Sequence, residues 1–205
     1  MKIAIAQLNY LIGDFEGNSR QIHDAARHAV EENAVLLILS ELSLCGYPPL
    51  DLLEREEFVR TCEDQLRELT SSLPPSLGVL VGAPEFNPEK EGKLLFNSAF
   101  FMEGGTIRQV FRKSLLPTYD IFDEYRYFEP NRSFRLLEFR GKRIAVTICE
   151  DLWDEQPFES EFSRSRLYTA NPLEELMKMG PDLVVNLAAS PFSNGKMKVK
   201  QSIFT

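Results

Sequence analysis

The chain has 205 residues, of which 43% are hydrophobic and 26% are charged, the balance of an ordinary soluble globular protein. Its 31 acidic and 23 basic residues give a net charge of −8 without a long basic run, so we expect neither nucleic acid nor an anionic membrane as a partner. The longest apolar run, residues 34–39, is too short to span a bilayer, and the N-terminus lacks the features of a signal peptide.

The first part of the chain alternates strand-like and helix-like segments. Residues 2–8 alternate and are rich in isoleucine, whereas two later apolar runs are continuous, as in strands that are covered on both faces. Helical spacing follows Asn18, which with Gln21 three residues later is typical of a capping box. Residues 54–72 predict a charged amphipathic helix. The predicted strands of this part are residues 2–8, 35–39 and 79–83.

The second part combines hairpins with a further strand–helix pattern. Glycine-containing turns at residues 103–105 and around Gly141 predict two hairpins. A short helix ends at Gly180, and another helical pattern begins at Lys196. Together the elements predict one continuous α/β domain with a mixed sheet and outer helices. The predicted elements are strands at 95–102, 107–113, 134–139, 143–149 and 183–187 and a helix at 172–179.

Three reactive side chains, Glu41, Lys113 and Cys149, lie at the carboxyl ends of predicted strands, where α/β sheets place their sites. Taken singly, each has a structural reading: a loop acid, a solvated lysine or a small buried hydrophobe. Together they are a complete set for acyl transfer. The thiolate is a nucleophile, the carboxylate can carry its proton, and the cation can stabilise an oxyanion.

Other arrangements are weaker. His23 and His28 are five residues apart on one predicted helix and do not share a face, so we expect no histidine-based triad. The chain has no Cys-x-x-Cys pair and no glycine-rich phosphate loop. The acids Asp120, Asp123 and Glu124 could suggest a metal, but the aromatic residues around them favour a pocket wall, so we expect none. Three scattered cysteines indicate a reducing, cytoplasmic compartment.

The sequence around these three residues resembles the nitrilase, or carbon–nitrogen hydrolase, superfamily. The matching motifs are residues 39–42, 111–113 and 148–151. This resemblance implies a nitrilase-like αββα sandwich with a Glu–Lys–Cys triad at its strand ends. Three further stretches are similar to the glutaminase domains of glutamine-dependent NAD synthetases: residues 44–53, 116–124 and 149–153.

The resemblance also implies roles for other residues. Glu41 is expected to be the base, Lys113 the oxyanion partner and Cys149 the nucleophile, while Glu124 matches a second glutamate that orients the triad. The residues that match positions at or near the bound glutamine are Tyr119, Phe122, Glu150 and Ser190.

The reaction implied is hydrolysis of the glutamine side-chain amide without a cofactor. The ammonia would pass to a synthetase domain of the same polypeptide, which uses ATP and magnesium to amidate nicotinic acid adenine dinucleotide. A homo-oligomer is also expected. The Ser-Gly-Gly motif of that synthetase is missing, so we expect the C-terminal part of the glutaminase domain and the synthetase domain to lie outside these 205 residues. Two alternatives stay open, a free-standing amidase for another small amide and a non-catalytic assembly domain.

Overall fold

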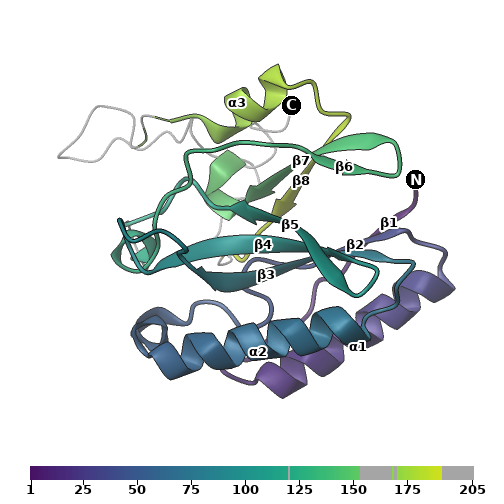
Figure 1. The fold of residues 1–205 in the computed structure, drawn as a ribbon, viewed down its shortest axis with the longest axis horizontal. Coiled ribbons are helices and arrows are strands. Elements are labelled where there is room, and N and C mark those ends of the chain that lie inside the picture. The colour runs from purple at the N-terminus through teal and green to yellow at the C-terminus, as the bar shows by residue number, and fades with distance from the viewer. Residues whose placement is uncertain (120, 153–167, 169, 191–205) are drawn as a thin grey trace.

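Two β-sheets pack face to face between layers of helices (Figure 1). The computed structural model describes residues 1–119, 121–152, 168 and 170–190. Helices α1 (Phe15–Glu31) and α2 (Glu56–Ser72) cover the outer face of the larger sheet, and α3 (Pro172–Lys178) lies on the outer side of the smaller one. This arrangement confirms the expected αββα sandwich with mixed sheets.

The larger sheet has the strand order β1-β2-β3-β4-β5. Its first three strands are parallel to one another, whereas β3, β4 and β5 are joined by antiparallel pairing. Two antiparallel steps return β5 to the direction of β2, so these two strands end at the same edge of the sheet. The strands are β1 (Ile3–Ile5), β2 (Leu36–Ile38), β3 (Gly78–Phe86), β4 (Leu95–Glu103) and β5 (Thr106–Arg112).

The smaller sheet contains β6 (Leu137–Phe139), β7 (Lys142–Ile148) and β8 (Leu183–Leu187). The central strand β7 is antiparallel to β6 and parallel to β8. The remaining elements are short 3₁₀ turns at Leu50–Glu54, Glu124–Arg126 and Cys149–Leu152.

Two hydrophobic clusters hold the layers together. One fills the space between the sheets, where Leu80 and Phe101 of the larger sheet belong to the same cluster as Ile144 of the smaller one. The other lies under the helices, where Ile22 of α1 and Leu69 of α2 are almost fully buried. Each such side chain contributes roughly 1.5–3 kcal/mol on burial, so the clusters fix the sheets against each other.

The predicted start of the first helix is wrong. Helix α1 begins at Phe15, and the carboxylate of Asp14 caps it by accepting a hydrogen bond from Gly17 N at 3.0 Å. Asn18 lies inside the helix and is fully buried. Its amide bonds the backbone of Leu11 and Leu44, so it anchors two loops instead of capping a helix.

The other elements are confirmed, with shifts at their ends. The first strand is shorter than predicted because β1 pairs only along the three residues of β2. The second helix begins at Glu56, after a 3₁₀ turn. Gly180 follows α3 with φ +66°, as expected of a residue that ends a helix. The helical pattern from Lys196 lies outside the described residues.

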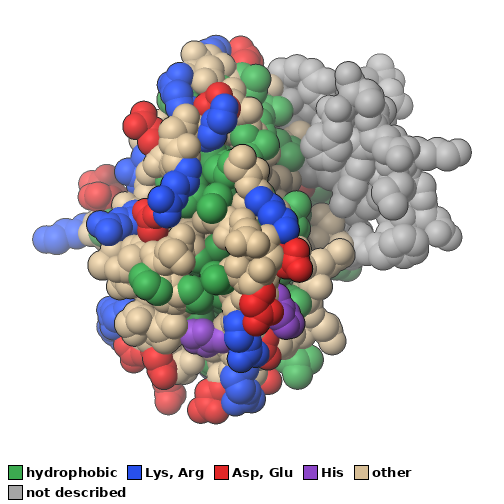
Figure 2. Space-filling view, turned by 90° about the vertical axis from the view of Figure 1, so that its right-hand side faces the viewer, with side chains coloured by type: hydrophobic (Ala, Val, Ile, Leu, Met, Phe, Trp, Pro, Cys, Tyr) green, Lys and Arg blue, Asp and Glu red, His purple; other side chains and the backbone are tan. Residues whose placement is uncertain are grey.

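Charged side chains of both signs are interspersed over the face shown in Figure 2, with hydrophobic side chains gathered between them. In the part of the chain that the structure describes, no helix is both long and apolar enough to cross a membrane.

Candidate active site

Three strand ends bring the predicted triad together. Glu41 follows β2, Lys113 follows β5 and Cys149 follows β7, and their exposed fractions are only 1%, 0% and 4%. Lys113 Nζ donates to Glu41 Oε1 at 2.7 Å. Both residues act electrostatically on the Cys149 thiol, which therefore belongs to the same buried cluster.

The loop that carries Glu41 passes directly over β3 at Gly82. A Cβ at Gly82 would lie 2.4 Å from Leu42 N and 2.6 Å from Ser40 O, closer than any side chain can approach. Ser43 Oγ also accepts a hydrogen bond from Gly82 N at 3.2 Å. The absence of a side chain at Gly82 thus allows the loop to hold Glu41 at this depth.

Glu124 completes a buried ion cluster around Lys113. The lysine donates a second hydrogen bond to Glu124 Oε2 at 2.6 Å, and Tyr47 OH donates to Glu124 Oε1 at 3.0 Å. Burial raises the pKa of Glu124 to about 7, although Lys113 opposes the rise. Burial would lower the pKa of the Lys113 amine, but Glu41 and Glu124 together raise it well above its usual value. Lys113 is therefore a permanent cation and not a proton carrier at neutral pH.

Cys149 occupies a sharp turn at the end of β7. Its φ of +44° is a conformation that side chains with a Cβ rarely adopt, and such strain is concentrated at functional sites. Asn186 Nδ2 donates to Cys149 O at 3.3 Å, and Ser190 Oγ lies 3.7 Å from the thiol sulfur. Burial and the charge of Glu41 raise the pKa of the Cys149 thiol, with Lys113 opposing them. The thiol is thus protonated at rest and needs a base before it can attack.

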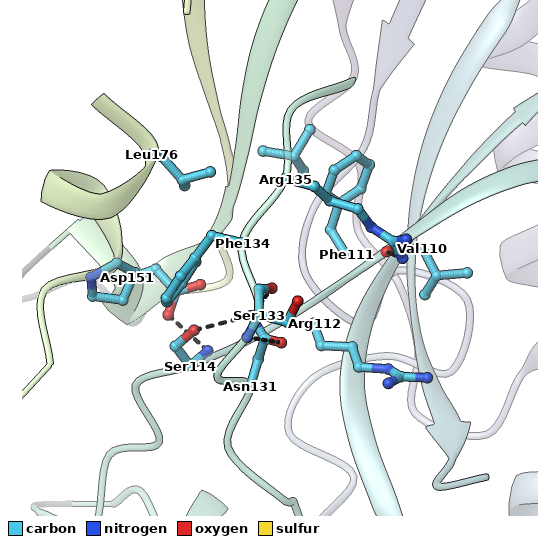
Figure 3. A pocket seen from close by; sticks show the side chains of 12 residues that line it. Val110, Phe111, Arg112, Ser114, Asn131, Ser133, Phe134, Arg135, Asp151 and Leu176 are labelled. Atoms are coloured by element: carbon cyan, nitrogen blue, oxygen red, sulfur yellow. Dashed lines mark hydrogen bonds between the residues drawn. The ribbon is translucent and has the colours of Figure 1, made fainter. Parts of the chain in front are cut away.

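Asp151 connects the two segments that carry Lys113 and Cys149. Figure 3 shows its side chain beside Ser114. Its carboxylate accepts hydrogen bonds from Ser114 N and Leu115 N at 2.9 Å each and from Ile148 N at 3.1 Å. Burial raises the pKa of Asp151 to about 6, against the lowering effect of these bonds. The residue also lines a polar hollow of about 220 Å³ on the side of the site that faces α3.

The predicted substrate-binding residues surround the cluster in two groups. The buried carboxylate of Glu150 accepts hydrogen bonds from Tyr119 OH at 2.7 Å and Tyr168 OH at 3.1 Å. The rings of Tyr119 and Phe122 meet edge to face, with centroids 5.5 Å apart. Ser190 lies beside Cys149 at the other side.

A hollow of about 380 Å³ opens on the cluster. Glu41, Tyr47 and Ser190 line it, so a small molecule there would lie against the Glu41 carboxylate. Phe122 lines a smaller neighbouring hollow together with Tyr47 and Glu124. Ser190 thus lines the same hollow as Glu41, whereas Phe122 lines the neighbouring one.

Sequence reasoning missed several residues of this site. Tyr47 and Tyr168 were not singled out, although each donates a hydroxyl to a buried glutamate. Asn97 was also missed, although it donates to Glu41 at 2.9 Å. A polar residue inside the apolar strand segment 95–102 was the available signal, because fully buried polar residues are uncommon.

The chain has no arrangement typical of a metal centre in the described residues. No group of three or more histidine, cysteine, aspartate or glutamate side chains there is placed to hold an ion. The acids of the cluster surround an ammonium group instead.

Comparisons with known proteins agree with this geometry. Residues 2–184 match the model of the carbon–nitrogen hydrolase family. The chain is 45% identical over 206 residues to a glutamine-dependent NAD(+) synthetase of Synechocystis sp., covering 99% of this chain and 36% of the relative. A solved glutamine-dependent NAD+ synthetase of Acinetobacter baumannii aligns with a TM-score of 0.80 and 30% identity over 98% of this chain and 35% of that one.

A third comparison concerns the fold alone. An amidase of the nitrilase superfamily from Nesterenkonia aligns with a TM-score of 0.76 at 22% identity, over all of this chain and 70% of its own. The chain spans about a third of the length of the curated synthetases it matches. The family model matches residues 2–184, which is most of the chain. This chain therefore belongs to the carbon–nitrogen hydrolase family.

Proposed function

We propose that the chain hydrolyses the side-chain amide of glutamine through a thioester on Cys149. The observation that carries the proposal is the buried cluster in which Lys113 bridges Glu41 and Glu124 beside a thiol on a strained turn. Keeping one cation and two carboxylates out of water costs several kcal/mol per ion, so the cluster is poorly explained by stability. Perturbed titratable groups of this kind are concentrated at catalytic sites.

The proposed reaction begins with proton transfer from Cys149 to Glu41. The thiolate then attacks the carboxamide carbon, and Lys113 together with a backbone N–H after Cys149 stabilises the oxyanion. Glu41 returns the proton to the departing ammonia. A water molecule activated by Glu41 hydrolyses the glutamyl thioester, which restores the thiol. Glu124 holds Lys113 in place by accepting the second hydrogen bond that the ammonium group donates.

The surroundings of the cluster suit an amino-acid amide. Glu150 offers a buried carboxylate to an α-ammonium group, and the hydroxyls of Tyr119 and Tyr168 fix its orientation. Phe122 packs against Tyr119 and supports that wall. We assign Ser190 to the opposite side, near the sulfur and the reacting carbon.

A second reaction is proposed to use the ammonia. The relatives are named glutamine-dependent NAD(+) synthetases, and this chain matches about a third of their length. We propose that ammonia passes to a synthetase domain of the same polypeptide, which amidates nicotinic acid adenine dinucleotide. ATP and magnesium serve that second reaction, and we assign no residue of this chain to them. Three free, buried cysteines support a cytoplasmic location.

The test is a comparison of substrates. Ammonia release should be fastest from glutamine and slow from short aliphatic amides and nitriles, and Cys149→Ala should remove it. Faster release from an aliphatic amide would favour a free-standing amidase. A Cys149 thiol that alkylates no faster than Cys45 or Cys62 at neutral pH would indicate an inert assembly domain.

A further inference from the structure

Asn97 is a buried polar residue of β4 that the mechanism above does not use. Its side chain has no exposed surface, and its Nδ2 donates to Glu41 Oε1 at 2.9 Å. Its backbone carbonyl accepts a hydrogen bond from Lys113 N at 2.8 Å. One residue therefore sets the positions of two members of the proposed triad.

The chemistry fixes which end of the amide faces Glu41. An ionised carboxylate can only accept hydrogen bonds, so the amide nitrogen of Asn97 must point to it. Asn97 Oδ1 is then buried without a hydrogen-bond partner among the described residues. An unpaired buried acceptor reduces stability, so stability alone does not explain an asparagine at this position.

The hydrogen bonds that each carboxylate oxygen of Glu41 accepts indicate the effect of the contact with Asn97. Each carboxylate oxygen offers about two acceptor sites. Oε1 receives both Lys113 Nζ at 2.7 Å and Asn97 Nδ2 at 2.9 Å, which fill it. Among the residues that the structure describes, Oε2 receives only Ala189 N, at 3.2 Å, and so keeps one site for an incoming proton.

We infer that Asn97 is a positioning residue that, together with Lys113, occupies Oε1 of Glu41 and confines proton transfer to Oε2. The inference rests on the proposed function. The Sγ–H bond of Cys149 breaks, its proton moves to Oε2, and the electron pair left on sulfur forms the bond to the carboxamide carbon. When the carbon–nitrogen bond breaks, the same proton moves from Oε2 to the departing nitrogen.

Two substitutions at Asn97 test the inference, with Ser98→Ala as the matched control. Ser98 is equally buried on the same strand but bonds Glu85, at 2.7 Å, and not Glu41. Asn97→Leu should lower kcat for glutamine by about 10- to 100-fold, the effect of a lost hydrogen bond to a charged group, with KM within a few-fold. Its thermal midpoint should stay close to that of the wild type, because the lost hydrogen bond to Glu41 and the removal of the unpaired oxygen act in opposite directions.

Asn97→Asp supplies a readout that a purely structural role would not change. Above neutral pH its carboxylate faces Glu41 Oε1 without a proton to donate, so kcat should fall at least as far as in the leucine variant. Near pH 5 a protonated aspartate can donate its O–H to Oε1, and activity should recover relative to leucine. The rate at which iodoacetamide alkylates Cys149 should show the same pH dependence between pH 5 and 9. The aspartate variant should react faster than the leucine variant near pH 5 and no faster above neutral pH.

Wild-type rates in both variants, or the same pH profile for leucine and aspartate, would overturn the inference. If the leucine variant does not fold, the pH profile of the aspartate variant decides alone. A failure of the proposed function gives a different result, because wild-type Cys149 would then alkylate no faster than Cys149 in a Glu41→Gln chain.

Discussion

Replacing Lys113 by methionine would remove the one cation that lies between Glu41 and Glu124 in the part of the chain that the structure describes. The lysine and glutamate side chains have exposed fractions of 0%, 0% and 7%, so water cannot substitute for the lost charge. Removing one partner from a buried ion pair costs about 3–5 kcal/mol, and methionine keeps most of the apolar volume of the lysine stem. We therefore expect the free energy of unfolding to fall by about 3–5 kcal/mol at pH 8, with loss of glutamine hydrolysis.

The loss should depend on pH in a defined direction. Two buried carboxylates without a cation bind a proton more tightly than they do in the unfolded chain. A group whose pKa is raised on folding contributes stability below its unfolded pKa and loses that contribution as the pH rises through its folded pKa. The pKa of Glu124 is already raised to about 7, so the deficit of the variant should be clearly smaller at pH 5 than at pH 8.

The assay is urea unfolding of the wild type and Lys113→Met at both pH values. Lys142→Met is the matched control, since its ammonium pairs with Asp182 at 3.1 Å at the surface and its loss should change stability very little. A deficit at pH 8 no larger than that of the control, or an equal deficit at both pH values, would refute the buried-cluster reasoning.

Three further substitutions test other parts of the site. Glu41→Gln should reduce kcat by about 10²–10⁴-fold with little change in KM, measured by ammonia release, because the amide cannot carry the proton. Cys149→Ala should remove hydrolysis while lowering the free energy of unfolding by only about 1–2 kcal/mol in urea. Burial raises the pKa of Asp151 from 3.8 to about 6. The contribution of this carboxyl group to the free energy of unfolding should therefore be about 3 kcal/mol smaller at pH 7 than at pH 3. Asp151→Asn should remove that slope, and parallel stability–pH curves for the two proteins would contradict the assignment.

The strand ends could be predicted because each apolar run stops visibly before its reactive residue. Glu41 and Lys113 follow such runs almost directly, and the direction of the strands places their ends at one edge. The length of β1 could not be predicted, because it depends on a neighbour of only three residues. The first residue of α1 could not be predicted either, because Asp14 and Asn18 are both residue types that cap helices. The packing of two loops against Asn18 decides between them.

The supporting contacts of the site were less accessible to sequence reasoning. Asn97 and Glu41 are 56 positions apart, and Tyr47 and Glu124 are 77 apart. No local pattern specifies such pairs, because they depend on how β4 registers against β3 and on how the loops cross the sheet edge. Trp153, the last residue of the motif at residues 149–153 that supported the resemblance, lies outside the described residues.

The central claim is that Cys149 carries a glutamyl group during turnover. The most direct measurement is rapid acid quenching of the protein with glutamine, followed by peptide mass spectrometry of all three cysteines. We predict a glutamyl adduct on the Cys149 peptide alone, present in the wild type and absent from Cys149→Ala. Ammonia release without an adduct on Cys149, or an adduct on Cys45 or Cys62, would contradict the account.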